Sequence, residues 1–131
     1  MCIRDRLSEE GFKDKFGGSM HQQTAVQYEL EMLEAELEAA RLLVYKSAWM
    51  MDNKMPNSKE ASMGKAKAGR IGNRISLKCV EICSMQGFSE EHLLEKFSRD
   101  SKILDIFEGT QQIQQLIVAR QVLGKSSSDL K

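Results

Sequence analysis

The chain has 131 residues, 41% of them hydrophobic and 29% charged, which suits about one globular domain with a modest core. Its 19 basic and 19 acidic residues balance, so no net charge favours nucleic acid or an anionic membrane surface as a partner. No apolar run approaches the roughly 18 residues of a membrane-spanning helix. With a single proline and few segments that alternate as strands do, the sequence predicts an all-α fold.

The two ends of the chain differ from the predicted domain, which covers residues 7–124. Residues 1–6 continue no later helical pattern and look like a translated, non-native scar, from which we expect the chain to be the tail of a longer protein. Residues 125–131 are polar and are expected to form a flexible tail.

A long helix is predicted over residues 20–51, because apolar residues recur there at steps of three and four. Its predicted buried stripe consists of Leu30, Leu33, Leu37, Ala40, Val44, Ala48 and Met51. Pro56 cannot continue this helix, and a capping box from Asn57 to Glu60 is expected to start the next one. So short a turn predicts two antiparallel helices, as in an up-and-down helical bundle.

The second helix is predicted over residues 59–85. Its expected buried side consists of Met63, Ala66, Ile71, Ile75, Val80 and Ile82. Its basic residues also recur at helical spacing, and they are Lys67, Arg70, Arg74 and Lys78. Nucleic-acid binding is one interpretation, but no aromatic residues are interleaved to stack on bases. We therefore favour ion pairing with the acidic first half of another helix, or plain solvation.

Two shorter helices are predicted to complete the bundle. The first is capped by Ser89 and continues to about Ile106, and the second runs over residues 111–123 from an N-cap at Thr110 to Gly124. The residues that the last helix is expected to bury are Ile113, Leu116, Ile117 and Val122.

The cysteines do not form a disulfide framework. Cys79 and Cys83 lie one helical turn apart without a nearby pair of histidines, so buried thiols in a reducing compartment are favoured over a metal site. His92 likewise has no second ligand at metal-binding spacing, and no metal is expected.

The most informative residue is Glu108, a lone carboxylate on the connection between two helices. It follows Phe107 and precedes Gly109. Carboxylates beside apolar side chains are poorly solvated, which raises their pKa towards the working range of a general base. The alternative is a structural glutamate made acceptable by the positive end of the following helix. Local chemistry alone leaves both roles of Glu108 open, the general base and the structural glutamate, and favours the structural one.

Several segments resemble the carboxy-terminal helical domain of the acyl-CoA dehydrogenase family, over roughly residues 12–124. They are Arg-Asp-Ser-Lys-Ile at 99–103, Ile-Phe-Glu-Gly-Thr at 106–110, Ile-Val-Ala-Arg at 117–120, Ala-Val-Gln at 25–27 and the run at 37–45. The resemblance implies a flavin (FAD) enzyme of fatty-acid β-oxidation in which Glu108 removes the α-proton of an acyl-CoA while the β-hydrogen leaves as hydride. It also implies that the backbone N–H of Glu108 helps to polarise the thioester carbonyl.

The resemblance also assigns roles to other residues. It implies FAD contacts for Thr110, Gln112, Lys13, Phe16 and Gly87, with Lys13 standing where the family has arginine. It implies substrate contacts for Phe107, beside the acyl chain, and for Gly109, where the backbone approaches the substrate closely. Near Gly87 the family pattern is altered at Glu81, Ser84 and Met85.

The resemblance further implies an electron-transfer flavoprotein as the electron acceptor, a homo-oligomer (dimer or tetramer), and the bacterial cytoplasm or the mitochondrial matrix as the location. Two alternatives stay open. These residues on their own are a non-catalytic helical oligomerisation module, inactive without the rest of the enzyme, or the parent is an acyl-CoA oxidase-like member of the same family.

Overall fold

The computed structural model describes residues 25–129. The helices are α2 (Ala25–Asp52), α3 (Ser58–Cys83), α4 (Leu94–Ser101) and α5 (Gln111–Leu123), with 3-10 turns η1 (Ser84–Phe88), η2 (Lys102–Asp105) and η3 (Ser127–Asp129). The described part of the chain contains no strand, and the prediction of an all-α fold is confirmed. The expectations for residues 1–6, Lys13 and Phe16 lie outside the described residues.

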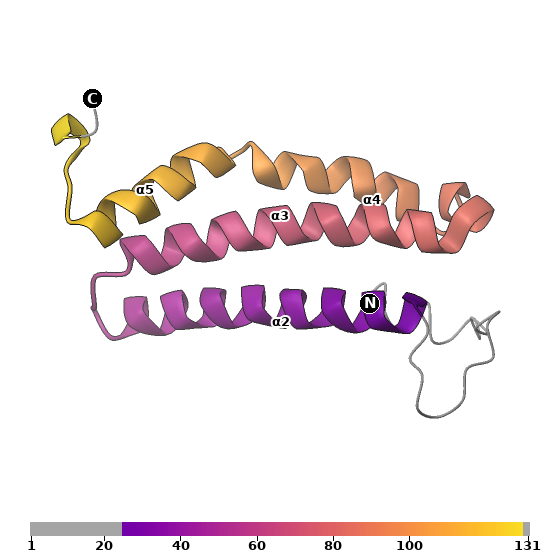
Figure 1. Ribbon diagram of the computed structural model, residues 1–131, viewed down its shortest axis with the longest axis horizontal. Coiled ribbons are helices and arrows are strands. Elements are labelled where there is room, and N and C mark those ends of the chain that lie inside the picture. Colours follow the sequence, from indigo (N-terminus) through magenta and orange to yellow (C-terminus); the bar gives the residue numbers. More distant parts are fainter. Residues whose placement is uncertain (1–24, 130–131) are drawn as a thin grey trace.

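Helix α3 is the centre of the arrangement. Figure 1 shows α2 running antiparallel along one side of α3, while α4 and α5 follow one another along the other side. Helix α3 therefore contacts α2, α4, α5, η1 and η2. Each of the other helices packs mainly on α3.

The predicted stripe of α2 is correct in its first half and wrong in its second. Leu33 and Ala40 are buried, but Val44 and Met51 are 45% and 64% exposed, and Met50 is buried instead. Each four-residue step turns the face of a helix by about 40°, so a stripe that takes two such steps in succession leaves the contact. Val44 stays at the edge of the contact, with its Cγ2 lying 3.4 Å from the position of a Cβ on Gly64 of α3, and Met50 takes the buried position at the end of α2.

The capping box predicted at the start of α3 is not formed. The Asn57 side chain makes no cap hydrogen bond, and its Nδ2 donates to the carbonyl oxygen of Ser47 at 3.0 Å, tying α3 to the end of α2. The carboxylate of Glu60, 11% exposed, lies 3.5 Å from Lys59 Nζ and 3.9 Å from Lys46 Nζ. A hydrogen bond from its own backbone N–H lowers the pKa of Glu60, and burial opposes this.

The segment after α3 also differs from its prediction. A continuous helix from Ser89 to Ile106 was expected, but α4 begins only at Leu94, after Leu93 in a left-handed conformation (φ 56°). The Ser89 hydroxyl instead accepts a bond from the Glu91 N–H within a turn, at 3.3 Å. This turn places Leu94 against Cys79 and Val80 in the buried core. Burial of one leucine therefore fixes where the helix starts.

Helix α5 has the predicted bounds but not the predicted burial. Thr110 caps it by accepting a bond from the Ile113 N–H at 3.4 Å, and Gly124 ends it at φ 63°. Ile113, Leu116 and Val122 are 51%, 37% and 70% exposed, and of the four expected residues only Ile117 is partly buried. The difference arises because α5 is covered mainly on the side that meets α3.

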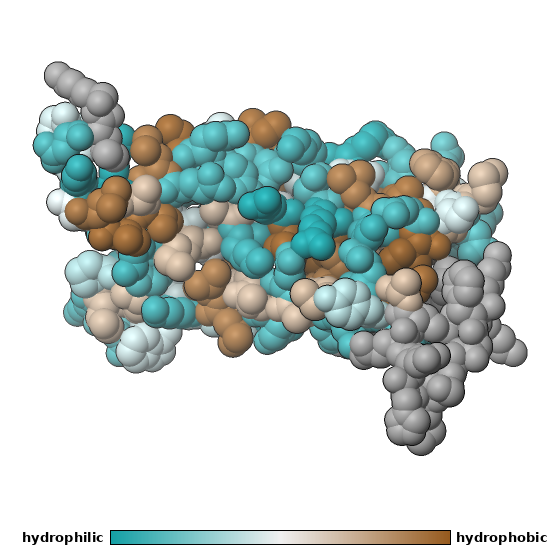
Figure 2. Space-filling model, in the orientation of Figure 1, coloured by the Kyte–Doolittle hydropathy of each residue, from teal (hydrophilic) through white to brown (hydrophobic). Residues whose placement is uncertain are grey.

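Apolar surface is abundant on the described chain. Figure 2 shows brown apolar patches among the hydrophilic residues of the viewed face, over more than one element. Within residues 25–129, no helix is both long and apolar enough to cross a membrane.

Candidate functional site

The candidate site is the turn at residues 106–110, which joins η2 to α5. Glu108 and Gly109 both have left-handed backbones, with φ of 55° and 94°. The backbone angle of Gly109 favours glycine, and a Cβ there would lie 2.7 Å from Nε2 of Gln114 and displace the end of that flexible side chain. The same Nε2 donates a hydrogen bond to the Glu108 carbonyl oxygen at 3.1 Å. The first turns of α5 therefore hold the backbone of the candidate base.

A lysine of α3 holds the other side of this turn. Lys65 Nζ donates to the carbonyl oxygen of Leu104 at 2.7 Å and to that of Gly109 at 2.8 Å. It also lies 5.7 Å from the ring centroid of Phe107, within the range of a cation–π contact. One ammonium group thus connects both ends of the turn to α3.

A second set of polar contacts lies just beside the turn. Gln111 Nε2 donates to the carbonyl oxygen of Ala66 at 2.9 Å and to Asp105 Oδ1 at 2.8 Å, and Lys102 Nζ donates to Asp105 Oδ2 at 3.0 Å. The hydrogen bond from Gln111, helped by Lys102 and opposed by burial, lowers the pKa of Asp105. An open hollow of about 290 Å³ adjoins these groups and is lined by Arg70, Asp105, Gln111 and Gln115.

Glu108 itself is exposed, and Phe107 is 46% exposed. The water-poor surroundings expected for the carboxylate are therefore not supplied by residues 25–129. What these residues do supply is the backbone conformation of the turn and its attachment to α3.

The structure brings five of the predicted site residues together. Phe107, Glu108, Gly109, Thr110 and Gln112 follow one another through the turn into the first turn of α5, with Gln112 exposed.

Gly87 lies elsewhere, buried in η1 against the end of α3. A Cβ at Gly87 would lie 2.5 Å from the Val80 carbonyl oxygen, so close packing alone requires this glycine. Its contact with FAD stays a prediction, as do those of Lys13 and Phe16, which lie outside the described residues.

Sequence reasoning missed the residues that hold the turn, namely Lys65, Gln111 and Gln114. A usable signal was the run Gly-Lys-Ala-Lys-Ala-Gly at residues 64–69, whose small side chains let another segment approach α3. Gly69 shows this directly, because a Cβ there would lie 2.7 Å from the Leu104 carbonyl oxygen.

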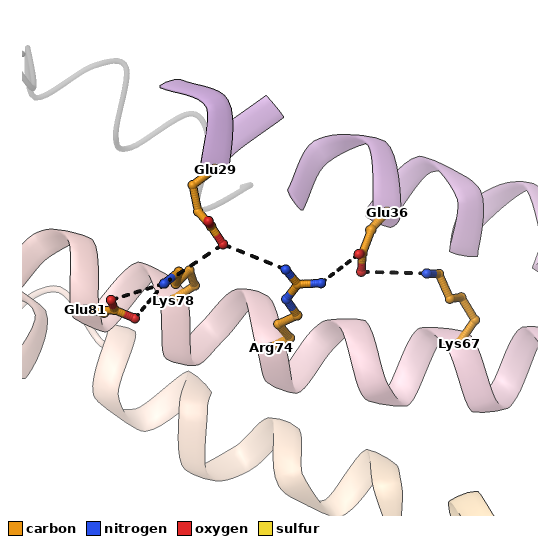
Figure 3. Close-up of polar contacts among 6 residues, drawn as sticks. All are labelled: Glu29, Glu36, Lys67, Arg74, Lys78 and Glu81. Carbon is orange, nitrogen blue, oxygen red and sulfur yellow. Dashed lines mark hydrogen bonds and ion pairs between the residues drawn. The ribbon is translucent and has the colours of Figure 1, made fainter. Parts of the chain in front are cut away.

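Three of the four basic residues predicted to form a stripe on α3 face the acidic half of α2, while Arg70 lines the hollow beside Asp105. Arg74 lies 2.7 Å from Glu36 and 3.8 Å from Glu29, and Lys67 lies 3.6 Å from Glu36. Lys78 bridges Glu29 at 4.0 Å and Glu81 at 2.9 Å, and the hydrogen bond to Glu81 is the main cause that raises the pKa of Lys78. Figure 3 shows this interhelical charge network, made of Glu29, Glu36, Lys67, Arg74, Lys78 and Glu81.

The thiols lie apart from the turn. Cys79 is buried in the core and Cys83 is partly buried. Among residues 25–129, no group of three or more His, Cys, Asp or Glu side chains has an arrangement suited to a metal ion.

Comparison with known proteins gives a consistent match. A family model described as "Acyl-CoA dehydrogenase, C-terminal domain" matches residues 12–123. The Caffeyl-CoA reductase-Etf complex subunit CarC of Acetobacterium woodii is 38% identical over 113 residues, which are 86% of this chain and 30% of that protein. The mitochondrial short-chain specific acyl-CoA dehydrogenase of Bos taurus is 36% identical over 111 residues, 85% of this chain and 27% of that protein.

The fold comparison agrees. The structure of butyryl-CoA dehydrogenase from Megasphaera elsdenii matches with a TM-score of 0.81 and 28% identity, over 92% of this chain and 32% of that chain. The chain thus spans about 30% of the length of these similar proteins.

Proposed function

The chain belongs to the acyl-CoA dehydrogenase family, whose C-terminal domain it matches, and we propose that it forms part of an enzyme that desaturates an acyl-CoA thioester between Cα and Cβ. The observation that carries this proposal is the turn at residues 106–110. Its left-handed backbone is fixed by bonds from Lys65 and Gln114, and it carries a single carboxylate, Glu108.

In the proposed reaction, Glu108 takes the α-proton of the thioester. This proton is weakly acidic, so the thioester carbonyl must be polarised while the proton leaves. The backbone N–H of Glu108 is the donor that we assign to this carbonyl oxygen. Gly109 lets the chain approach the substrate closely, and Phe107 offers an apolar face to the acyl chain.

FAD is the cofactor that we assign to this site, and when bound it accepts the β-hydrogen together with its electron pair. Thr110 and Gln112 would hold it, through a hydroxyl and an amide at the N-terminus of α5. These groups fit a flavin dinucleotide, because uncharged polar donors at a helix N-terminus suit both phosphate oxygens and carbonyl oxygens. We extend the assignment to Lys13, Phe16 and Gly87 on the family resemblance alone.

Exclusion of water makes a carboxylate more basic and strengthens the polarisation of the thioester carbonyl. Because Glu108 is exposed in the described part of the chain, we propose that protein outside residues 25–129 closes the pocket over it. For the electron acceptor we propose an electron-transfer flavoprotein, a partner supported by the relative from Acetobacterium woodii, which is named as a subunit of an Etf complex.

The test is Glu108→Gln in the complete enzyme that carries this domain. Glutamine keeps the size of the side chain but cannot accept the proton, so turnover should fall by about 100- to 10,000-fold while flavin absorbance and folding are retained. Glu90→Gln, on the exposed turn before α4, is the matched control and should leave turnover unchanged. Full turnover in Glu108→Gln would rule out the assignment.

A second candidate function, a helical oligomerisation module, is favoured by an apolar row on α2. Its large members are exposed and form two groups at helical spacing, Tyr28 with Met32 and Leu42 with Tyr45 and Trp49. Large apolar side chains exposed along one helix favour a contact with other protein, and a homo-oligomer is the contact that we propose. Flavin absorbance separates the two functions, since cofactor bound in stoichiometric amount by the 131-residue chain would contradict an inert module.

A further inference from the structure

We propose that Lys65 is the positioning residue for Glu108. Its ammonium group ties the turn at residues 106–110 to α3 and so fixes the direction in which the carboxylate is presented. This inference rests on the proposed function of Glu108 as the base. It adds a residue whose side chain contacts backbone oxygens on both sides of that base.

The contacts of Lys65 are those of a clamp. Its two acceptors are the carbonyl oxygens of Leu104 in η2, just before the turn, and of Gly109 near the end of the turn, at 2.7 and 2.8 Å. An ammonium group has three donors and no acceptor, so one lysine can bond both oxygens at once. Bonds from a charged donor are shorter and stronger than neutral ones. The clamp therefore joins the start of the turn to its end.

The conformation of the turn explains why a clamp is needed. Glu108 is not glycine, yet its backbone is left-handed, a conformation that a side chain disfavours and that persists only where neighbouring structure enforces it. Lys65 holds the turn from α3, and Gln114 holds the Glu108 carbonyl oxygen from α5. Gln114 lies in α5, into which the turn leads directly, so of these two residues only Lys65 ties the turn to the central helix α3.

The neighbouring residues fit the same role. Gly69, one turn further along α3, lets the backbone at Leu104 come close enough for Lys65 to reach it. Gln111 adds a bond to the Ala66 carbonyl oxygen, beside Lys65. The Phe107 ring lies 5.7 Å from the ammonium, so the clamp also orders the side chain next to the base.

The first test uses the 131-residue chain and the variant Lys65→Met, which keeps an unbranched apolar stem and removes the donors. Amide exchange at Ile106 and Phe107, whose N–H groups donate to the Ile103 carbonyl oxygen at 2.9 and 3.0 Å, should quicken by about tenfold or more, while exchange within α2 stays unchanged. The matched control is Lys67→Met, whose lysine faces Glu36 on α2 and whose loss should leave the turn unaffected. Unchanged exchange at Ile106 and Phe107 in Lys65→Met would overturn the proposal.

Two further measurements cover the case in which Lys65→Met fails to fold. Lys65→Arg keeps charge and donors, so it should fold and retain slow exchange at the turn. In the unaltered chain, nitrogen NMR should show a Lys65 ammonium signal that exchanges with water more slowly than the signals of exposed lysines such as Lys54. A Lys65 ammonium that exchanges as fast as the others would contradict the clamp.

The second test measures activity in the complete enzyme. Loss of positioning should lower kcat of Lys65→Met by about 10- to 100-fold with KM changed by less than about twofold, and Lys65→Arg should restore most of it. If Glu108→Gln keeps full turnover, the proposed function fails whatever Lys65 does. If Glu108→Gln is inactive but Lys65→Met has normal kcat and normal exchange, only the positioning role fails.

Discussion

The two sides of α3 are held by different kinds of bond. Towards α2 the polar contacts are ion pairs between side chains, as between Arg74 and Glu36, in a network where Arg74 is 49% exposed. Towards η2 and α5 they run from side chains to backbone oxygens, as from Lys65 to Leu104 and Gly109. The first kind joins the side chains of two regular helices, while the second holds the backbone of a turn. Backbone conformation is therefore controlled by polar contacts on the side of α3 that carries Glu108, and not on the side that faces α2.

The small residues of α3 show the same division. At Gly64, facing α2, an added Cβ would lie 3.4 Å from Val44 Cγ2, near ordinary van der Waals contact. At Gly69, facing η2, it would lie 2.7 Å from a backbone oxygen. A flexible side chain can move aside, but a backbone oxygen moves only with its whole segment.

The largest expected effect is that of Gly69→Ala. The added methyl group must push η2 away from α3, which should lower the free energy of unfolding by about 1–3 kcal/mol in urea titrations. Gly72→Ala is the matched control, because its Cβ would lie 3.5 Å from Leu104 Cδ1 in ordinary contact. Alanine suits a helix interior better than glycine, so the control should gain about 0.5–1 kcal/mol. Equal effects of the two variants would show that the close approach to the Leu104 carbonyl oxygen is not what requires glycine at position 69.

Thr110→Ala should have the next largest effect. It removes the N-cap of α5, and this should cost about 1 kcal/mol in the same titration. Thr110→Ser keeps the hydroxyl and should stay close to the unaltered chain. A serine variant as unstable as the alanine variant would show that the methyl group of Thr110, and not the cap, stabilises the helix.

Asp105 should make stability depend on pH at the turn. Its folded pKa lies below the unfolded value of about 3.9, so its contribution is fully present above that value and is lost as pH falls through the lower folded pKa. The unaltered chain should therefore exceed Asp105→Asn in urea midpoint by a constant amount above about pH 5, and the gap should shrink below about pH 4. Since the other carboxylates are common to both chains, a gap that does not shrink would exclude Asp105 as the cause.

The smallest effect belongs to the charge network on the α2 side. Arg74→Met should lower the free energy of unfolding by about 0.2–1 kcal/mol at low salt, because half-exposed ion pairs contribute little. Salt at about 1 M should abolish most of the difference, since screening then acts within about 3 Å. Gly69→Ala and Thr110→Ala should lose the same free energy of unfolding at about 1 M salt as at low salt. A loss in Gly69→Ala that shrinks with salt would contradict the difference between the two sides of α3.

Sequence patterns predict local features well here and long-range ones poorly. The bounds of α5 follow from Thr110 and Gly124, whose effects act within one turn of the chain, and the pairing of α2 with α3 follows from the order of their charges. The start of α4 does not follow, because it depends on burying Leu94 against residues of α3. The solvation of Glu108 was not predictable either, since it depends on what covers the turn and not on its apolar sequence neighbours.

The role of Lys65 could not be read from the sequence for a similar reason. Lys65 and Lys67 are chemically identical and lie two positions apart, so the sequence does not show which of them holds the turn and which pairs with Glu36. The distinction arises only from the position of each around the helix, because Lys65 meets the turn and Lys67 meets α2. Helical periodicity predicts that two such neighbours differ in direction, but not what each will meet.

The burial of the Cys79 sulfur makes its reactivity a measure of local opening in this domain. Cys79, 2% exposed, is packed under Leu94 at the end of α3 where α4 begins. A thiol-specific reagent can reach that sulfur only in molecules whose α4 has momentarily lifted away. The rate of alkylation at Cys79, followed separately from that at Cys2 and Cys83, thus reports how often this end of α3 is uncovered.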